Sequence, residues 1–138
     1  MQHVSSTDFS RRIASLTLSA RGLPKKPADF NIILVSAICD LSPSRRYSVK
    51  ELNADLQRWI LQVGSNFGID HVTLRRYLVD AGLLTRDTAG AEYSVRTSAH
   101  DFSFDPEIRA IDLPALLSAA KEERAERKRQ RQAKVERL

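Results

Sequence analysis

Several side chains in the middle of this 138-residue chain could recognise nucleic acid. Thr73 and Arg76 lie on the solvent face of a predicted helix, and arginine can bind the edge of guanine with two hydrogen bonds in the major groove. Arg75, on the flank of that helix, and Arg86, in a following β-prone run, are placed to neutralise phosphates, with His71 as an adjustable donor. The pattern predicts contact with nucleic acid, and double-stranded DNA is the partner we expect.

The same side chains also have structural interpretations. Arginines on an exposed helix face often contact only solvent, and Arg75 could pair inside the fold with Glu51 or Asp80. Asn53 is expected to have a structural role, either orienting a neighbouring arginine or holding the turn before the next helix, because most side-chain hydrogen bonds serve the nearby fold. The sequence leaves both interpretations of the arginines open.

Most of the excess positive charge lies at the end of the chain. The net charge is +5, from 22 Lys and Arg against 17 Asp and Glu, and residues 121–138 carry +4 of it. This segment could bind phosphate backbones without sequence preference. The residues predicted to do so are Arg127, Lys128, Arg129 and Arg131. A solvated single helix held by pairs such as Glu123–Arg127 is the competing interpretation, and the lack of an apolar seam argues against a coiled coil.

Residues typical of catalysis or metal binding are scattered along the chain. His3, His71 and His100 do not form a cluster with metal-ligand spacing around the single cysteine. Cys39 falls within an apolar helical stretch, where a thiol is usually inert. No glycine-rich loop that would hold phosphates is present. We therefore expect a protein that is not an enzyme and needs no cofactor or metal.

The composition also bears on where the protein works. A single cysteine cannot form an internal disulfide, which suits a reducing compartment. No apolar run reaches the length of a membrane span, and no secretory signal is visible at the start of the sequence. We expect a cytoplasmic protein with no membrane partner.

The elements that would position the candidate residues can be read from apolar spacing and capping signals. Four amphipathic helices are predicted before a β-hairpin, and a fifth follows it. The ranges are about 6–20, 27–41, 48–63 and 71–81 for the four helices, 83–95 for the hairpin, and a last helix from about 113. The predicted N-caps are Ser6 or Thr7, Ser48 with Glu51 in a capping box, Asp70 and Asp112. The stretch 64–68 is predicted to be a loop, and Arg45–Tyr47 a short extended segment.

Three helices followed directly by a hairpin predict the fold class. We expect a mostly α protein with a small β-hairpin, namely a winged helix-turn-helix with N- and C-terminal helical extensions. The predicted organisation is an N-terminal helix in 1–22, the winged-helix domain in 23–95, an irregular connector in 96–112, and in 113–138 a helix ending in a basic arm. Phe102 and Phe104 are expected to pack the connector against the domain.

A set of short motifs resembles a known bacterial family. They are Leu23-Pro24-Lys25-Lys26, Tyr47-Ser48 with Glu51-Leu52-Asn53, Asp70-His71 with Leu74-Arg75-Arg76 and Leu78-Val79, then Gly82, Arg86, Gly90 and Tyr93. Over about residues 23–95 the chain resembles the bacterial domain-of-unknown-function family numbered 2087. The resemblance implies a winged-helix-like unit, which in relatives is often attached to transcription-regulator domains, and it implies no established activity. This chain departs from the family pattern by showing no separate regulator domain in front and by a longer stretch at 62–69.

These observations together predict a protein that binds double-stranded DNA and regulates transcription. A homodimer would suit palindromic recognition and exchange of the terminal helices between copies. Two other functions remain open from the sequence. The first is a protein-interaction adaptor that uses the wing or the terminal helices, and the second is an RNA-binding protein.

Overall fold

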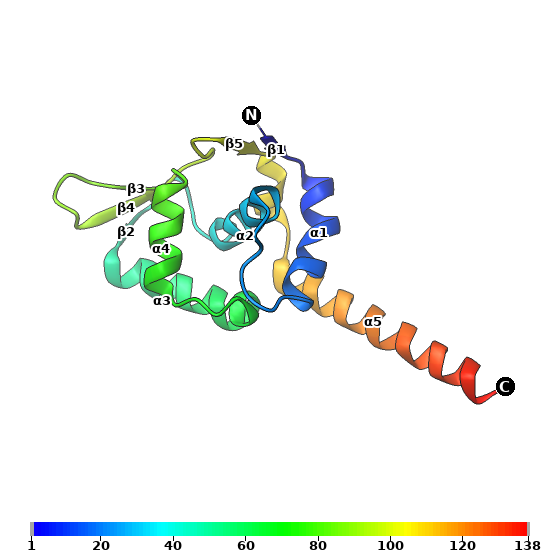
Figure 1. Ribbon diagram of the computed structural model, residues 1–138. Coiled ribbons are helices and arrows are strands. Elements are labelled where there is room, and N and C mark those ends of the chain that lie inside the picture. The colour runs from blue at the N-terminus through cyan, green and yellow to red at the C-terminus, as the bar shows by residue number, and fades with distance from the viewer. Residues whose placement is uncertain (1, 138) are drawn as a thin grey trace.

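The computed structural model describes residues 2–137 and shows a mostly helical body with two small sheets, from which one long helix projects (Figure 1). The helices are α1 (Ser6–Leu18), α2 (Pro27–Ile38), α3 (Val49–Trp59), α4 (His71–Asp80) and α5 (Leu113–Glu136). The strands are β1 (Gln2–Val4), β2 (Arg46–Ser48), β3 (Leu84–Arg86), β4 (Glu92–Val95) and β5 (Phe102–Phe104). The expectation of a mainly α chain with a small antiparallel element is confirmed.

Helix α2 forms the centre of the core, between α1 and α4 (Figure 1). All residues from Ile32 to Cys39 are buried, so the helix is covered on every side rather than along one stripe. The helix ends at Ile38, earlier than the predicted Leu41, although Leu41 itself is buried. Arg109 fixes this end, because its guanidinium donates to the carbonyl oxygen of Leu41 at 2.8 Å.

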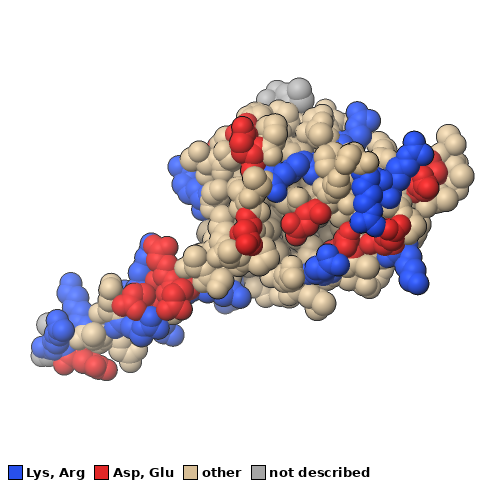
Figure 2. Space-filling view, turned by 180° about the vertical axis from the view of Figure 1, so that it is seen from behind, with Lys and Arg blue, Asp and Glu red and all other residues tan. Residues whose placement is uncertain are grey.

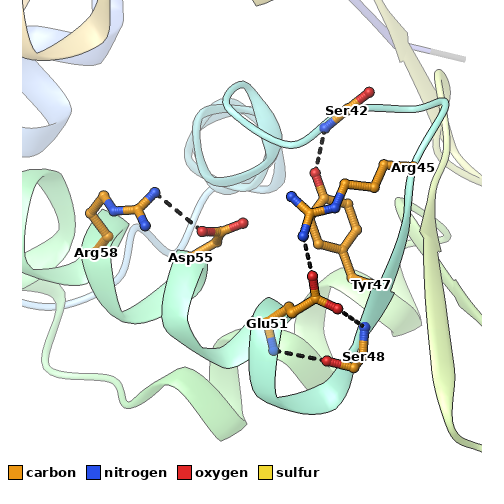
Figure 3. Close-up of polar contacts among 7 residues, drawn as sticks. All are labelled: Ser42, Arg45, Tyr47, Ser48, Glu51, Asp55 and Arg58. Atoms are coloured by element: carbon orange, nitrogen blue, oxygen red, sulfur yellow. Dashed lines mark hydrogen bonds and ion pairs between the residues drawn. The ribbon is translucent and has the colours of Figure 1, made fainter.

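The start of α3 is held by a network of local hydrogen bonds (Figure 3). The Ser48 hydroxyl accepts from the Glu51 amide and a Glu51 carboxylate oxygen accepts from the Ser48 amide, each at 3.1 Å. The predicted capping box is therefore confirmed. The other Glu51 oxygen pairs with Arg45, whose guanidinium lies 4.6 Å from the centroid of the Tyr47 ring. The Tyr47 hydroxyl accepts from the Ser42 amide at 2.8 Å, which fastens β2 to the end of the preceding loop.

The chain after α3 stays helical where a loop was predicted, so that prediction is wrong. It passes through a π-helical turn, η1 (Ile60–Gly64), and a 3-10 turn, η2 (Ser65–Phe67). Phe67 stacks on Trp59 with ring centroids 6.0 Å apart, and a side chain at Gly64 would collide with the Trp59 ring. Val63 and Phe67 in this stretch are buried where the backbone coils past Trp59, whereas Leu61 is 81% exposed.

Helix α4 begins and ends where the sequence predicts. A carboxylate oxygen of Asp70 accepts from the Thr73 amide at 2.8 Å, and Gly82 takes the positive φ of 82° that terminates the helix. The predicted hairpin follows as β3 and β4. The Arg45–Tyr47 stretch was predicted only as extended, and β2 joins the hairpin to give a three-stranded antiparallel sheet in the order β2-β4-β3.

The N-terminus is built into the body by a strand pair that the sequence analysis did not predict. Strand β1 pairs in parallel with β5, with His3 opposite Ser103. The prediction that 96–112 is irregular is therefore wrong in part, because it contains β5 and a 3-10 turn, η3 (Pro106–Ala110). Both members are three-residue strands from opposite ends of the chain, so no local pattern marks them.

Two further expectations concern the helices at the ends of the body. The N-cap of α1 is Ser5, whose hydroxyl accepts from the Asp8 amide, rather than Ser6 or Thr7 as predicted. The predicted cap of α5 is confirmed, because Asp112 accepts from the Ala115 amide at 3.1 Å. Phe102 and Phe104 are buried as expected. Among the described residues, no helix has the length and apolar character needed to cross a membrane.

Candidate nucleic-acid interface

The solvent face of α4 lies beside the hairpin (Figure 1). Leu74 and Leu78 on its inner face are fully buried, which fixes the rotation of the helix. Val72 is then 50% exposed, Arg76 is exposed and Thr73 is half-buried. Within residues 2–137, Arg76 has no acidic side chain at ion-pair distance. The face therefore presents a guanidinium without an ion-pair partner, an apolar side chain and a hydroxyl, and the exposed Asp80 follows one turn later on the same face.

The Arg75 side chain makes its contacts within the protein. Its guanidinium donates to the Asn53 side-chain oxygen and lies 5.8 Å from the centroid of the Tyr93 ring. The internal partner is Asn53, and neither Glu51 nor Asp80 forms the ion pair that the sequence suggested. The structural role expected of Asn53, orienting a neighbouring arginine, is confirmed. Arg75 thereby joins α3, α4 and β4.

His71 lies at the first turn of α4, where the sequence placed it. Its Nδ1 is 3.3 Å from the side-chain nitrogen of Gln57 on α3, so the two side chains share a hydrogen bond. His71 itself is half-buried. At about 100° per residue, Thr73 lies on the same side of α4 as Arg76, whereas His71 lies on the side that meets Gln57 of α3.

The hairpin adds charges of both signs to this end of the molecule. Arg86 is exposed at the end of β3, close to the turn glycine Gly90. Arg46 on β2 pairs with Glu92 on β4 at 3.5 Å. Figure 2 shows basic side chains at the hairpin end, on the right of the view, with acidic ones between them. This surface is mixed in charge, and Arg86 is the predicted contact residue that it presents to solvent.

The tail residues predicted to bind phosphate do not share one environment. Helix α5 continues to Glu136, and the side chains of all four residues are exposed. Arg129 pairs with Glu122 and Glu126, and Arg127 pairs with Glu123. Lys128 and Arg131 form no ion pair within the described residues. The arm also points away from the hairpin, so these residues lie far from the α4 surface (Figure 1).

A contact between a serine, a histidine and an aspartate escaped the sequence analysis. His3 Nδ1 lies 2.7 Å from the Ser103 hydroxyl, and His3 Nε2 lies 2.6 Å from the Asp105 carboxylate. Asp105 also accepts from the Ser6 amide at 2.8 Å. The hollow beside His3 is lined by Asp8, Arg11 and Arg12 among others, and Ser103 does not open into it. The contact fastens β1 and the start of α1 to β5. No spacing pattern in the sequence predicted it, because His3 lies about 100 residues before Ser103 and Asp105.

The single cysteine lies in the core. Cys39 is 8% exposed, and burial raises the pKa of its thiol to about 12. The thiol is therefore protonated at neutral pH and is shielded from reagents. Across residues 2–137, no three His, Cys, Asp or Glu side chains are grouped so that they could hold a metal ion.

The fold and surface define a mostly helical protein with a small antiparallel sheet and a projecting charged helix. Residues 21–95, which run from the α1–α2 connection to the end of β4, match the model of a family described as an uncharacterized protein conserved in bacteria. The chain belongs to this family, domain of unknown function 2087, as its motifs indicate. No curated protein and no solved structure matches the chain.

Proposed function

We propose that residues 23–95 form a winged helix that binds double-stranded DNA. The supporting observation on the fold is the element order α2, β2, α3, α4, β3, β4 with the sheet order β2-β4-β3. In a winged helix, the helix before the hairpin enters the major groove and the hairpin meets the phosphates. Here these parts are α4 and the β3–β4 turn.

The observation that carries the proposal is the solvent face of α4. An α-helix fits the major groove, which is about 12 Å wide, and arginine binds guanine there through two hydrogen bonds. Arg76 is exposed and unpaired among the described residues, and Val72, one helical turn away, offers methyl groups that suit contact with thymine methyl groups. Thr73 adds a hydroxyl on the same side of the helix. The face thus combines hydrogen-bonding and apolar readout.

Arg75 serves this surface as a positioning residue. Its hydrogen bond to Asn53 and its contact with the Tyr93 ring tie α4 to both α3 and the hairpin. The angle between the proposed recognition helix and the wing is therefore fixed before DNA binds, which lowers the cost of ordering the interface. Arg86 on the wing and His71 at the start of α4 are the proposed phosphate contacts.

Transcription regulation is the process we propose for this DNA binding. The basis for this proposal is the α4 surface, which would let the protein occupy a particular DNA site. A homodimer in the cytoplasm would place two α4 helices on successive half-sites about 34 Å apart.

An adaptor function is less well supported. The apolar side chains of α1 that could have met a partner, Phe9 and Ile13, are fully buried against the rest of the chain. The N-terminal helix is therefore part of the body and offers no apolar stripe to another protein.

The decisive experiment compares two arginine variants of the full chain. A preferred duplex is first selected from a random pool, and binding is then measured by fluorescence anisotropy. Arg76→Ala is expected to weaken binding by about tenfold or more, because a bidentate guanine contact is worth about 1–3 kcal/mol. Arg11→Ala on α1 removes the same charge from an exposed residue on another helix and is expected to change binding little.

The outcomes separate the proposed functions. Equal effects of the two variants, or no binding to any duplex, would contradict DNA reading by α4. Tighter binding to a single-stranded or hairpin RNA competitor would favour RNA binding instead.

A further inference from the structure

The projecting part of α5 separates its charges onto two sides of the helix. At about 100° per residue, six basic residues fall within about 140° of the helix circumference. This basic face consists of Lys121, Arg124, Arg127, Lys128, Arg131 and Lys134. The acidic residues of the described arm fall outside that sector, and they are Glu122, Glu123, Glu126 and Glu136. The helix therefore has a strongly positive side despite its mixed composition.

Ion pairing leaves most of the basic face uncompensated. Arg129, predicted from the sequence as a phosphate contact, lies on the acidic side, where it pairs with Glu126 and Glu122, so it is not part of the proposed basic face. On the basic face only Arg127 has an acidic partner in the described chain, Glu123. The side chains of the face are all exposed. The arm thus has one side on which the positive charges are largely unpaired and another side that carries the carboxylates.

The direction of the arm is set by its attachment to the body. Leu113 and Leu117 in the first two turns are buried, and Arg124 donates to the Ser19 hydroxyl at the end of α1 at 3.2 Å. Beyond this point α5 runs away from the body, at the end opposite the hairpin (Figures 1 and 2). The basic face and the α4 surface therefore lie at opposite ends of the molecule.

The charge pattern favours a phosphate backbone as the occupant of the basic face. The six cations extend over about 20 Å, at 1.5 Å per residue, and duplex DNA carries about one charge per 1.7 Å of its axis. A membrane surface would require an apolar face on the same helix, yet Val135 is the only large apolar side chain of the described arm that is well exposed. A second copy would require an apolar seam, which the arm lacks.

We propose that the basic face of α5 binds the backbone of a second segment of duplex DNA, separate from the segment bound by α4. One chain would then bridge two duplex segments, one read by α4 and the other bound without sequence preference. The bridging part of this inference rests on the proposed function of α4, whereas the phosphate contact of the arm does not.

The first test uses two variants of the full chain that remove equal charge from opposite sides of one helix. The basic-face variant is Lys128→Gln/Arg131→Gln, and the matched control is Arg129→Gln/Arg137→Gln. Binding to a mixed-sequence duplex is measured over a salt series. The basic-face variant is expected to reduce the slope of log K against log salt by about 2, because each lost phosphate contact removes about 0.9. The control is expected to retain the slope of the unmodified chain.

The second test asks whether two duplexes are held at once. A biotinylated duplex carrying the selected site is fixed to beads, and capture of a fluorescent mixed-sequence duplex is measured. The unmodified chain and the control variant are expected to capture the second duplex. The basic-face variant and Arg76→Ala are both expected to lose capture, because bridging needs both surfaces.

Each result has a distinct meaning. Equal salt slopes for the basic-face variant and its control would overturn the phosphate contact. Capture that persists in the basic-face variant would overturn the bridging role of the arm and point to a dimer that holds two duplexes through two α4 helices. If Arg76→Ala alone is without effect in binding and capture, the proposed function of α4 fails, and a reduced slope in the basic-face variant still supports the phosphate contact of the arm.

Discussion

At the scale of single residues, the hydroxyl of one buried serine, Ser36, has hydrogen-bond partners on two sides. Ser36 is 2% exposed, and its hydroxyl donates to the carbonyl oxygen of Ile33 at 2.6 Å. The same hydroxyl accepts the indole N–H of Trp59 at 3.2 Å. One small side chain thus satisfies a buried donor on α3 from the central helix α2, since an indole N–H without a partner is costly inside a protein.

Replacing this hydroxyl should destabilise the protein measurably. Ser36→Ala leaves the Trp59 N–H without an acceptor, and we expect a loss of about 1–3 kcal/mol in the free energy of unfolding. Urea unfolding followed by the fluorescence of the single tryptophan measures it. Ser118→Ala, at an exposed position of α5, is the control. A Ser36→Ala variant as stable as the control would mean that the indole finds another acceptor.

Residue roles could be predicted from the sequence only where the partner is close along the chain. The capping partners of Ser48 and Asp70 are three residues away and were found from spacing alone. Arg75 falls on the flank of α4, where helical periodicity cannot distinguish a phosphate contact from a contact with Asn53, 22 residues earlier. His3 and Asp105 are 102 residues apart, so no spacing rule connects them.

At the scale of elements, the caps that set the ends of helices also carry a pH dependence. The hydrogen bond from the Thr73 backbone amide lowers the pKa of Asp70 below its usual range. A carboxyl whose pKa is depressed by folding adds stability above its unfolded pKa, about 3.9, and loses that contribution as pH falls through the folded value. The start of the proposed recognition helix is therefore expected to weaken in acid.

The variant Asp70→Asn tests this pH dependence. An asparagine oxygen still caps the helix but does not titrate, so the cap becomes independent of pH. We expect the unmodified chain to be the more stable of the two at about pH 6, and this advantage to vanish toward about pH 2. Thermal unfolding of both proteins across that range measures it. A difference that stays constant with pH would show that the ionised cap adds no stability beyond the neutral one.

Helices and strands were predicted correctly where the sequence pattern runs over many residues, and they were missed where the pattern is short or has two interpretations. The hairpin was found because two β-prone runs flank a turn containing Gly90. Gly64 was interpreted as a helix stop, whereas its missing side chain allows the π-helical turn to pack against Trp59. Strands β1 and β5 have three residues each, too few for an alternating pattern to appear.

At the scale of the whole molecule, α5 belongs to two environments. Its first two turns bury Leu113 and Leu117 in the body, while residues from Lys121 onward are almost entirely exposed. The outer part is held by backbone hydrogen bonds and by ion pairs between its own side chains, each worth only about 0.2–0.5 kcal/mol. One continuous helix therefore has a stable base and a weakly stabilised arm.

Amide hydrogen exchange should show this division. We expect amides in the last three turns of α5 to exchange far faster than those near Leu117, because isolated helices of this length are marginal in water. Mass spectrometry of peptides from both parts measures the rates. Uniform protection along α5 would contradict the division and indicate that the arm is covered, for example by a second chain. Added duplex DNA should slow exchange in the arm if its basic face binds phosphates.

The pairing of β1 with β5 has a consequence for the order in which the chain folds during synthesis. Residues 2–4 leave the ribosome about 100 residues before their partners at 102–104. Until then the first strand has no edge to join, and the His3 contacts with Ser103 and Asp105 cannot form. The helices between them can pack earlier through contacts nearer in sequence. Strand β1 is therefore made before the helices of the body but is among the last elements to be fixed in place, and the emergence of β5 is the step that closes the body.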